Sequence, residues 1–237
     1  RGSGLIRTIQ KIPNLKVMAC CDVLPFRLES AMQFADKKAK SYVDYKALLE
    51  DKKLDAVIIS TPLHLHRDVA VDAINAGKHI YLEKTMTKNI DEAQDLVKKV
   101  ASSKKIFQVG HQYHSSRLYA NIVNTIEQGY IGEIKSFEAQ WNRNGDWRRA
   151  VSEPKYEKQI NWRMYRDYSN GLLGELSSHQ IDFVNWVTGA HPTSVIGTGG
   201  IDYWKDGRET YDNIHAMFDY PNGVKASFTC LTSNAFE

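Results

Sequence analysis

The sequence has 237 residues, a formal net charge of +3, 42% hydrophobic residues and 25% charged residues. Such values are typical of a globular protein with one large domain or two modest ones. The small charge and the scattered basic residues exclude the clustered positive surface of a nucleic-acid-binding protein and give no reason to expect an acidic membrane as partner. No apolar run approaches the ~20 residues that cross a bilayer.

The three cysteines form neither a disulfide framework nor a metal clip, because two are adjacent and the third is distant. This usage fits a reducing compartment. We therefore expect a cytoplasmic protein, with export to the periplasm as the alternative, since the sequence opens at Arg1 without a methionine. We also expect both ends to lie inside a longer protein.

Strands alternate with helices in the first half of the chain, which predicts βαβ units and a parallel sheet with helices on both faces. The clearest strand is a β-branched run that ends at Ser60, and Gly77 is a plausible helix C-cap. The expected strands are 15–21, 56–59, 79–82 and 106–110, and the expected helices are 5–10, 26–34, 44–49, 66–76 and 91–102.

The pattern of predicted strands and helices changes near residue 112. Longer strands with a Pro-Asn-Gly turn at 221–223 predict an antiparallel sheet packed with a few helices. The fold class is therefore α/β, with a parallel-sheet domain over 1–112 followed by an α+β domain over 113–237 that has a large, mainly antiparallel open sheet. The expected strands are 133–141, 194–204, 213–219 and 224–231, and the expected helices are 116–128 and 179–187.

The beginning of the chain has features of a dinucleotide site. Such a site needs glycines where a strand turns into a helix, and Gly2 or Gly4 fits the last glycine of that turn, if the first strand and first glycines precede Arg1. An ordinary loop is the alternative. Asp22 follows the next strand, where an acid binds the ribose hydroxyls and favours NAD. Nearby Arg27 leaves NADP open.

Polar residues also follow the strand 56–59, at the edge where open α/β sheets bind ligands. Ser60, Thr61 and Pro62 are therefore expected to contact the cofactor. His64 and His66 suggest metal ligands, but no nearby acid or cysteine completes a tetrahedron, so no metal is predicted. We expect His66 to start a helix and His64 to face the cofactor.

Two further groups could carry chemistry. Glu83 and Lys84 follow the strand 79–82, where a lysine can stabilise an alkoxide as hydride leaves; an ordinary surface pair is the alternative. His179 and Asp182 are three residues apart and share one helical face. A histidine beside a carboxylate is a reasonable general base for a carbinol proton, with a buried, capped helix start as the alternative.

The loop over 141–163 interleaves aromatic residues with arginines and asparagines. Sugars bind to such walls, because flat rings lie on CH-rich faces while polar groups read hydroxyls. Asn142, Arg163 and Tyr165 are the predicted substrate contacts. An exposed loop or a subunit contact is the alternative.

Taken together, these pieces resemble the Gfo/Idh/MocA oxidoreductases, a family that includes glucose-fructose oxidoreductase and inositol dehydrogenase. The resemblance covers essentially the whole chain. Thr85 stands where the family has proline, which leaves the backbone after Lys84 open. The matching stretches are Thr61-Pro62 through His66, Ala76-Gly77-Lys78-His79, Glu83-Lys84, Gln108-Val109-Gly110, 129–134 and His179-Gln180-Ile181-Asp182.

The resemblance implies a Rossmann domain that carries NAD(P), and a second domain whose open sheet mediates homodimers or homotetramers. It implies Lys84, His179 and Asp182 as the catalytic group, with Glu83 and Gln112 near the cofactor. The implied activity is hydride transfer between nicotinamide and a carbinol of a sugar, polyol or sugar derivative.

Two alternatives to that activity remain. One is an NAD-dependent glycoside hydrolase that works by transient oxidation, elimination, hydration and reduction. The other is a non-catalytic dinucleotide-binding regulatory protein, against which the presence of Lys84, His179 and Asp182 argues.

Overall fold

A computed structural model describes residues 1–234 of the chain. The chain divides into two compact units, 1–110 and 111–237, each with its own sheet and core. Within residues 1–234 every helix is too short or too polar to span a bilayer.

The first unit is built from parallel strands. β3 pairs with β4 and β4 with β5, while β1 and β2 form a separate two-stranded parallel ladder. Because parallel strands must be joined by crossovers, helices separate most of them, and the α/β expectation is confirmed. The strands are β1 Ala19–Cys21, β2 Lys40–Tyr42, β3 Ala56–Ile59, β4 His79–Leu82 and β5 Phe107–Val109; the helices are α1 Gly2–Ile9, α2 Pro25–Met32, α3 Tyr45–Leu49, α4 His66–Asn75 and α5 Ile90–Ser102.

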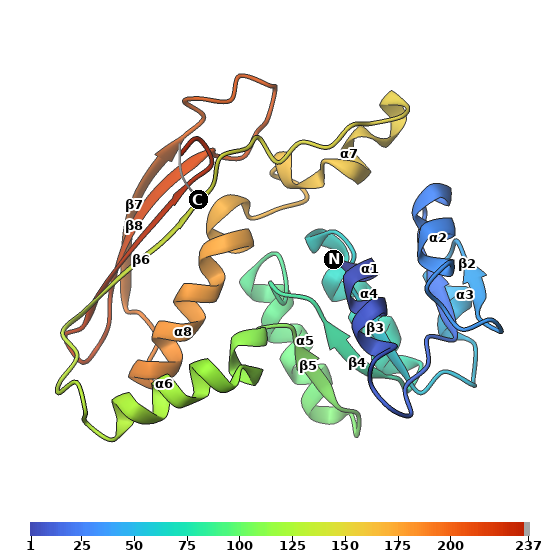
Figure 1. Cartoon of the computed structure of the whole chain (residues 1–237), viewed down its shortest axis with the longest axis horizontal. Coiled ribbons are helices and arrows are strands. Elements are labelled where there is room, and N and C mark those ends of the chain that lie inside the picture. Colours follow the sequence, from blue (N-terminus) through green and yellow to red (C-terminus); the bar gives the residue numbers. More distant parts are fainter. Residues whose placement is uncertain (235–237) are drawn as a thin grey trace. The chain divides into compact units, whose positions relative to one another are not determined.

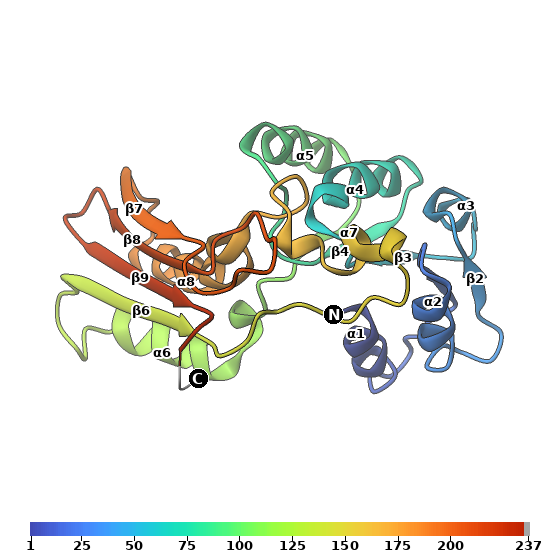
Figure 2. The same cartoon turned by 90° about the horizontal axis from the view of Figure 1, so that it is seen from above.

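The core of this unit lies where α4 packs on β3 and β4, and α3 and α5, which pack against α4, add Leu49 and Leu96 to it (Figure 2). Leu82 of β4 and Leu96 of α5 are completely buried. Burying such a side chain stabilises the fold by about 1.5–3 kcal/mol. The core therefore holds the carboxyl ends of β3 and β4 at one edge of a rigid sheet.

Helix ends follow local rules. The Asn89 side chain accepts a hydrogen bond from the Glu92 amide and donates one to the Glu92 carboxylate, so Asn89 is the N-cap of α5. Gly77 follows α4 with a φ of +72°, a conformation that favours glycine. The Gly77 cap was predicted from the sequence, whereas the Asn89 cap was not.

Two expected boundaries in this unit are wrong. The strand expected over 15–21 begins at Ala19, because Asn14 turns the chain with a φ of +66° and Leu15 is exposed. The helix expected over 5–10 begins at Gly2 instead. Gly2 and Gly4 therefore lie in the first turn of α1.

The second unit has one four-stranded sheet in the order β6-β9-β8-β7. β7–β8 and β8–β9 are antiparallel, whereas β6 runs parallel to β9. The expectation of a mainly antiparallel sheet with helices is confirmed. The strands are β6 Ser136–Asn142, β7 Ser194–Gly200, β8 Asn213–Asp219 and β9 Lys225–Leu231; the longer helices are α6 Arg117–Glu127 and α8 Ser178–Thr188, and α7 Glu157–Ile160 is a single turn.

One face of this sheet is covered by helices. Figure 1 shows α8 along that face, and Val184 of α8 packs among Phe218 and Phe228. A single π-helical turn, Leu173–Ser177, runs directly into α8, which ends at Gly189 with a φ of +60°. The opposite face carries exposed Ile196 and Met217.

The strand expected over 194–204 is also too long, since β7 ends at Gly200. The cause is Asp212, which is fully buried. Its carboxylate accepts hydrogen bonds from the amides of Asp202, Tyr203 and Trp204, at 2.8–3.2 Å. These bonds turn the chain out of the sheet into the loop 201–212.

Candidate functional site

Strand ends and a helix start meet in the first unit. A Cβ atom on Gly2 would lie 2.7 Å from Ser60 Oγ, so α1 approaches the end of β3 as closely as glycine permits. Beside them, Arg1 Nε donates to the carboxylate of Glu83, 3.0 Å away, which follows β4 and is buried. We name Gly2, Ser60, Thr61, Glu83 and the backbone between them the strand-end cluster.

His66 fastens this cluster. It starts α4 as expected, is 2% exposed, and its Nδ1 and Nε2 lie 2.8 Å from the Thr85 carbonyl and 3.1 Å from the Thr61 carbonyl. One imidazole therefore lies between the chain after β3 and the chain after β4 and donates a hydrogen bond to at least one of the two carbonyl groups. Both ring nitrogens are engaged, which speaks against a metal ligand, and no group of three or more His, Cys, Asp or Glu side chains in residues 1–234 is placed to hold a metal ion.

Asp22 directly follows β1 and is half-buried. Its Oδ1 accepts the Leu24 amide at 2.9 Å. Burial raises the pKa of this carboxyl above its usual range, while the Leu24 amide and the charge of Arg27 act in the opposite direction. A half-buried acid at a strand end is suited to accept hydrogen bonds from a ribose diol.

These residues fit a dinucleotide. Thr61 Oγ1 is buried and has no hydrogen-bond partner among residues 1–234, so a ligand hydroxyl or phosphate would satisfy it. The close approach at Gly2 leaves amides of a helix start near the strand ends, which suits a pyrophosphate. His64 lies in a single 3-10 turn before α4, and Lys84 precedes a cis peptide bond to Thr85.

In the second unit, the imidazole of His179 is 5% exposed at the start of α8 and is surrounded by rings. Its centroid lies 4.9 Å from Tyr113 and 5.6 Å from Trp141. Burial raises the pKa of Tyr113, in keeping with this enclosure. The rings fix the orientation of the imidazole, as a base acting on one substrate proton requires.

Asp182, one helical turn after His179, contacts two other histidines. Its Oδ2 lies 2.8 Å from His114 Nε2 and 3.6 Å from His111 Nδ1, and His114 stacks on Trp186 at 4.3 Å. Neither histidine was singled out in the sequence, although both closely follow β5. A shallow pocket of about 390 Å³ opens beside this carboxylate; its walls include His111, Asn170, Ser178, Asp182 and Asn185.

The predicted substrate contacts are engaged within the protein. Arg163 Nε donates to Glu175 at 2.7 Å, and the Tyr165 hydroxyl donates to Glu157 at 2.9 Å. Asn142 Nδ2 donates to Gln140, while its buried Oδ1 has no partner in the described chain. Gln112 is exposed in a 3-10 turn. Glu175, buried four residues before His179, was missed by the sequence reading.

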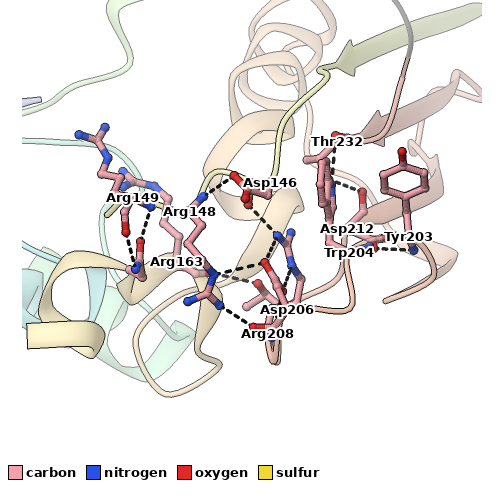
Figure 3. Close-up of polar contacts among 12 residues, drawn as sticks. Asp146, Arg148, Arg149, Arg163, Tyr203, Trp204, Asp206, Arg208, Asp212 and Thr232 are labelled. Carbon is pink, nitrogen blue, oxygen red and sulfur yellow. Dashed lines mark hydrogen bonds and ion pairs between the residues drawn. The ribbon is translucent and has the colours of Figure 1, made fainter. Parts of the chain in front are cut away.

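A network of ion pairs holds the loop around 148 to the loop around 206 (Figure 3). Arg148 contacts both Glu157 and Asp206, and Arg208 binds Asp206 from the other side. The hydrogen bond from Arg208 lowers the pKa of Asp206 to about 2. These two loops of the second unit are therefore held together by ion pairs.

Comparison with known proteins decides the family. Residues 2–111 match the oxidoreductase family model with an NAD-binding Rossmann fold, and residues 119–237 match the GFO/IDH/MocA C-terminal domain. The chain belongs to the Gfo/Idh/MocA oxidoreductase family. The resemblance expected from the motifs is confirmed, and so is an NAD-binding Rossmann domain in the first unit.

Several relatives of this Gfo/Idh/MocA chain act on sugars or inositols by name. It is 29% identical over 162 residues to levoglucosan dehydrogenase of Pseudarthrobacter phenanthrenivorans, covering 68% of this chain and 39% of that one. It is 31% identical over 184 residues to inositol 2-dehydrogenase of Salmonella paratyphi B, covering 77% and 50%. A glycosyl hydrolase family 109 protein of Shewanella pealeana is 27% identical over 173 residues, covering 70% and 37%.

Among solved structures, the NAD-binding protein from Listeria innocua superimposes with a TM-score of 0.83 at 25% identity, covering 100% of this chain and 63% of that one. The match to each of the three curated relatives named above thus spans half or less of that relative's length.

Proposed function

We propose that the whole protein is an NAD-dependent oxidoreductase that oxidises a carbinol of a sugar, a polyol or a sugar derivative. The observation that carries the proposal is the buried imidazole of His179, oriented by rings and one turn from Asp182, in a chain whose other unit is an NAD-binding domain. The named dehydrogenases among its relatives support the substrate class.

In the proposed reaction, the His179 imidazole accepts the hydroxyl proton of the substrate, and the Lys84 ammonium donates a hydrogen bond to the developing alkoxide. Bound NAD supplies the hydride acceptor, so that the C–H and O–H bonds break and a carbonyl forms. Asp182, one helical turn from His179, would add negative charge that favours the protonated imidazole.

The strand-end cluster would hold the cofactor. The α1 start at Gly2 and the residues Ser60, Thr61 and Pro62 would contact the phosphates and ribose, with Glu83 and Gln112 nearer the nicotinamide. His64 is the remaining residue proposed to contact the cofactor. We assign NAD rather than NADP because a 2′-phosphate would be repelled by Asp22.

A redox-neutral glycoside hydrolase is the second candidate, supported by the relative in glycosyl hydrolase family 109. One experiment separates the two. The full-length protein is incubated with sugars, polyols and aryl glycosides while NADH and free aglycone are both followed. Stoichiometric NADH is expected; aglycone release without net NADH would favour the hydrolase, and silence in both channels with NAD bound would overturn both.

We also propose that the protein is a homodimer or homotetramer through the open sheet face. Ile196 and Met217 face each other across β7 and β8 and are 74% and 51% exposed. Exposed apolar pairs on a flat sheet are typical of interfaces. Light scattering should show an oligomer that the double substitution Ile196→Glu/Met217→Glu dissociates; a wild-type monomer would contradict this proposal.

A further inference from the structure

Planar side chains and guanidinium groups alternate in the second unit. We name Trp141, Arg143, Trp147, Arg163 and Trp162 the Trp–Arg strip. The Arg143 Cζ lies 5.6 Å from the Trp141 ring and 5.7 Å from the Trp147 ring. The Arg163 Cζ lies 5.7 Å from Trp147 and 4.1 Å from Trp162. Each guanidinium group is thus flanked by two indole rings.

The two arginines of the strip differ in charge compensation. Arg163 is neutralised by its ion pair with buried Glu175. Arg148, in the same loop, is neutralised by Glu157 and Asp206. Arg143 forms no ion pair within residues 1–234, although it is half-buried. In the described chain its charge meets indole rings rather than a carboxylate, so the guanidinium remains available to bind an anionic ligand.

The backbone around Arg143 is held firmly. Its amide donates to the Leu231 carbonyl at 2.7 Å, and the Gly145 amide donates to the Thr232 carbonyl at 2.9 Å. Trp147 has a φ of +65°, which is rare for a bulky residue and persists only where surrounding contacts impose it. Arg208 supplies such a contact by donating to the Asp146 carbonyl (Figure 3). The segment is therefore preorganised rather than loose.

The strip begins at the proposed base. The Trp141 ring stacks on the His179 imidazole at 5.6 Å and also lies 5.6 Å from the Arg143 guanidinium, so one indole ring contacts both groups. A pyranose whose hydroxyl reaches His179 can therefore present a substituent toward Arg143. Its CH groups would contact the indole rings between the two.

We propose that Arg143 binds an oxyanion of the substrate, so that the preferred substrate of this oxidoreductase is an acidic sugar rather than a neutral one. A planar guanidinium can bind both oxygens of a carboxylate at once, with geometry that a neutral hydroxymethyl group cannot match. A phosphate ester offers the same oxyanion chemistry. This inference rests on the proposed oxidoreductase function.

The test measures kcat/KM of the full-length protein with NAD for three substrates: a hexuronate, a hexose 6-phosphate and the matching neutral hexose. The variants are Arg143→Leu, Arg143→Lys and the matched control Arg149→Leu. Arg149 belongs to the same loop, its side chain is exposed, and Figure 3 shows its guanidinium turned away from the ion pairs.

We expect the wild type and Arg149→Leu to prefer an anionic sugar by roughly 30-fold or more over the hexose. Arg143→Leu should lose that preference without losing NAD binding, and Arg143→Lys should keep part of it. A preference for the uronate over the phosphate identifies a carboxylate, and the reverse identifies a phosphate. Equal wild-type rates with acidic and neutral sugars, or equal losses for both in Arg143→Leu, would overturn the inference.

A binding experiment separates this inference from the proposed function. Titration calorimetry of the NAD-loaded protein measures the affinity for the hexuronate and the hexose without turnover. If no sugar is oxidised but the wild type still binds the hexuronate more tightly than Arg143→Leu does, the anion site stands and the reaction does not. Equal affinities in wild type and Arg143→Leu would remove the anion site.

Discussion

The strand-end cluster of the first unit and the ring-enclosed site of the second are held in different ways. In the first, apart from the Arg1–Glu83 ion pair, side chains bind backbone atoms: His66 lies between two carbonyl groups, and Asp22 accepts a hydrogen bond from a backbone amide. In the second, side chains hold side chains, as when Arg163 pairs with Glu175. Where a side chain binds the backbone, a second substitution cannot replace the lost hydrogen bond. Where two side chains bind each other, substituting the second one as well can recover the stability lost with the first.

The largest expected effect is a loss of kcat on substitution of one catalytic candidate from each unit. Lys84→Ala and His179→Asn should each lower kcat by about 10²–10⁴-fold, since each removes a group that acts on the reacting hydroxyl. NAD affinity should remain near that of the wild type, measured by nicotinamide fluorescence. Exposed Lys104→Ala is the control. Loss of NAD binding with normal turnover at saturation would make Lys84 a cofactor clamp instead.

The next prediction concerns repair in the second unit. Arg163→Met removes the ion pair of the Glu175 carboxylate, whose side chain is 5% exposed. We expect a loss of about 3 kcal/mol in unfolding free energy, the low end for a buried pair because Arg163 is one-third exposed. The double variant Arg163→Met/Glu175→Gln should recover most of that loss. Urea unfolding followed by tryptophan fluorescence measures the stability of both variants. A double variant as unstable as the single one would contradict the claim that the second substitution recovers the lost stability.

The corresponding change in the first unit should resist repair. His66→Leu conserves volume but leaves the Thr61 and Thr85 carbonyl groups without the imidazole. We expect a loss of about 1–3 kcal/mol in unfolding free energy, together with weaker NAD binding because the strand-end cluster loosens. Denaturant unfolding and an NAD titration measure the two. Normal stability combined with normal affinity would show that the imidazole does not fasten the cluster.

The smallest expected effect depends on pH. The hydrogen bond from Arg208 lowers the pKa of Asp206 to about 2, so the folded state favours the ionised carboxylate. Its stabilising contribution is complete above the ordinary Asp pKa of about 4 and is lost as the pH falls through about 2. Asp206→Asn should therefore unfold with a flatter dependence on pH between about 5 and 2 than the wild type. Parallel curves would contradict the ion-pair role.

The two sites also differ in how far the sequence predicts them. Ser60 and Glu83 directly follow strands that the local sequence pattern predicts. Because the carboxyl ends of parallel strands meet at one edge of the sheet, the two positions could be predicted to lie near each other. The helix start at His66 and the strands β3 and β4 could be predicted for the same reason. The early end of β7 could not, because it depends on Asp212, which accepts hydrogen bonds from three amides at the other end of the loop 201–212.

In the second unit, the sequence shows that His179 and Asp182 share a helical face but not what surrounds them. Tyr113 and Trp141 reach the imidazole from distant parts of the chain, and His114 reaches Asp182 across 68 residues. Glu175 is visible as an acid four residues before His179, yet only the fold shows that it is buried beside Arg163. Long-range contacts of this kind leave no local pattern.

The pairing of β6 with β9 has a consequence for biosynthesis. Ser136 of β6 is aligned with Lys225 of β9, so one ladder joins segments separated by most of the second unit. Such a distant closure is entropically slow, whereas β3 and β4 are linked by a short crossover. During synthesis, the backbone groups of β6 lack their β9 partners until the intervening residues have been added. Chaperones would be most useful at this stage.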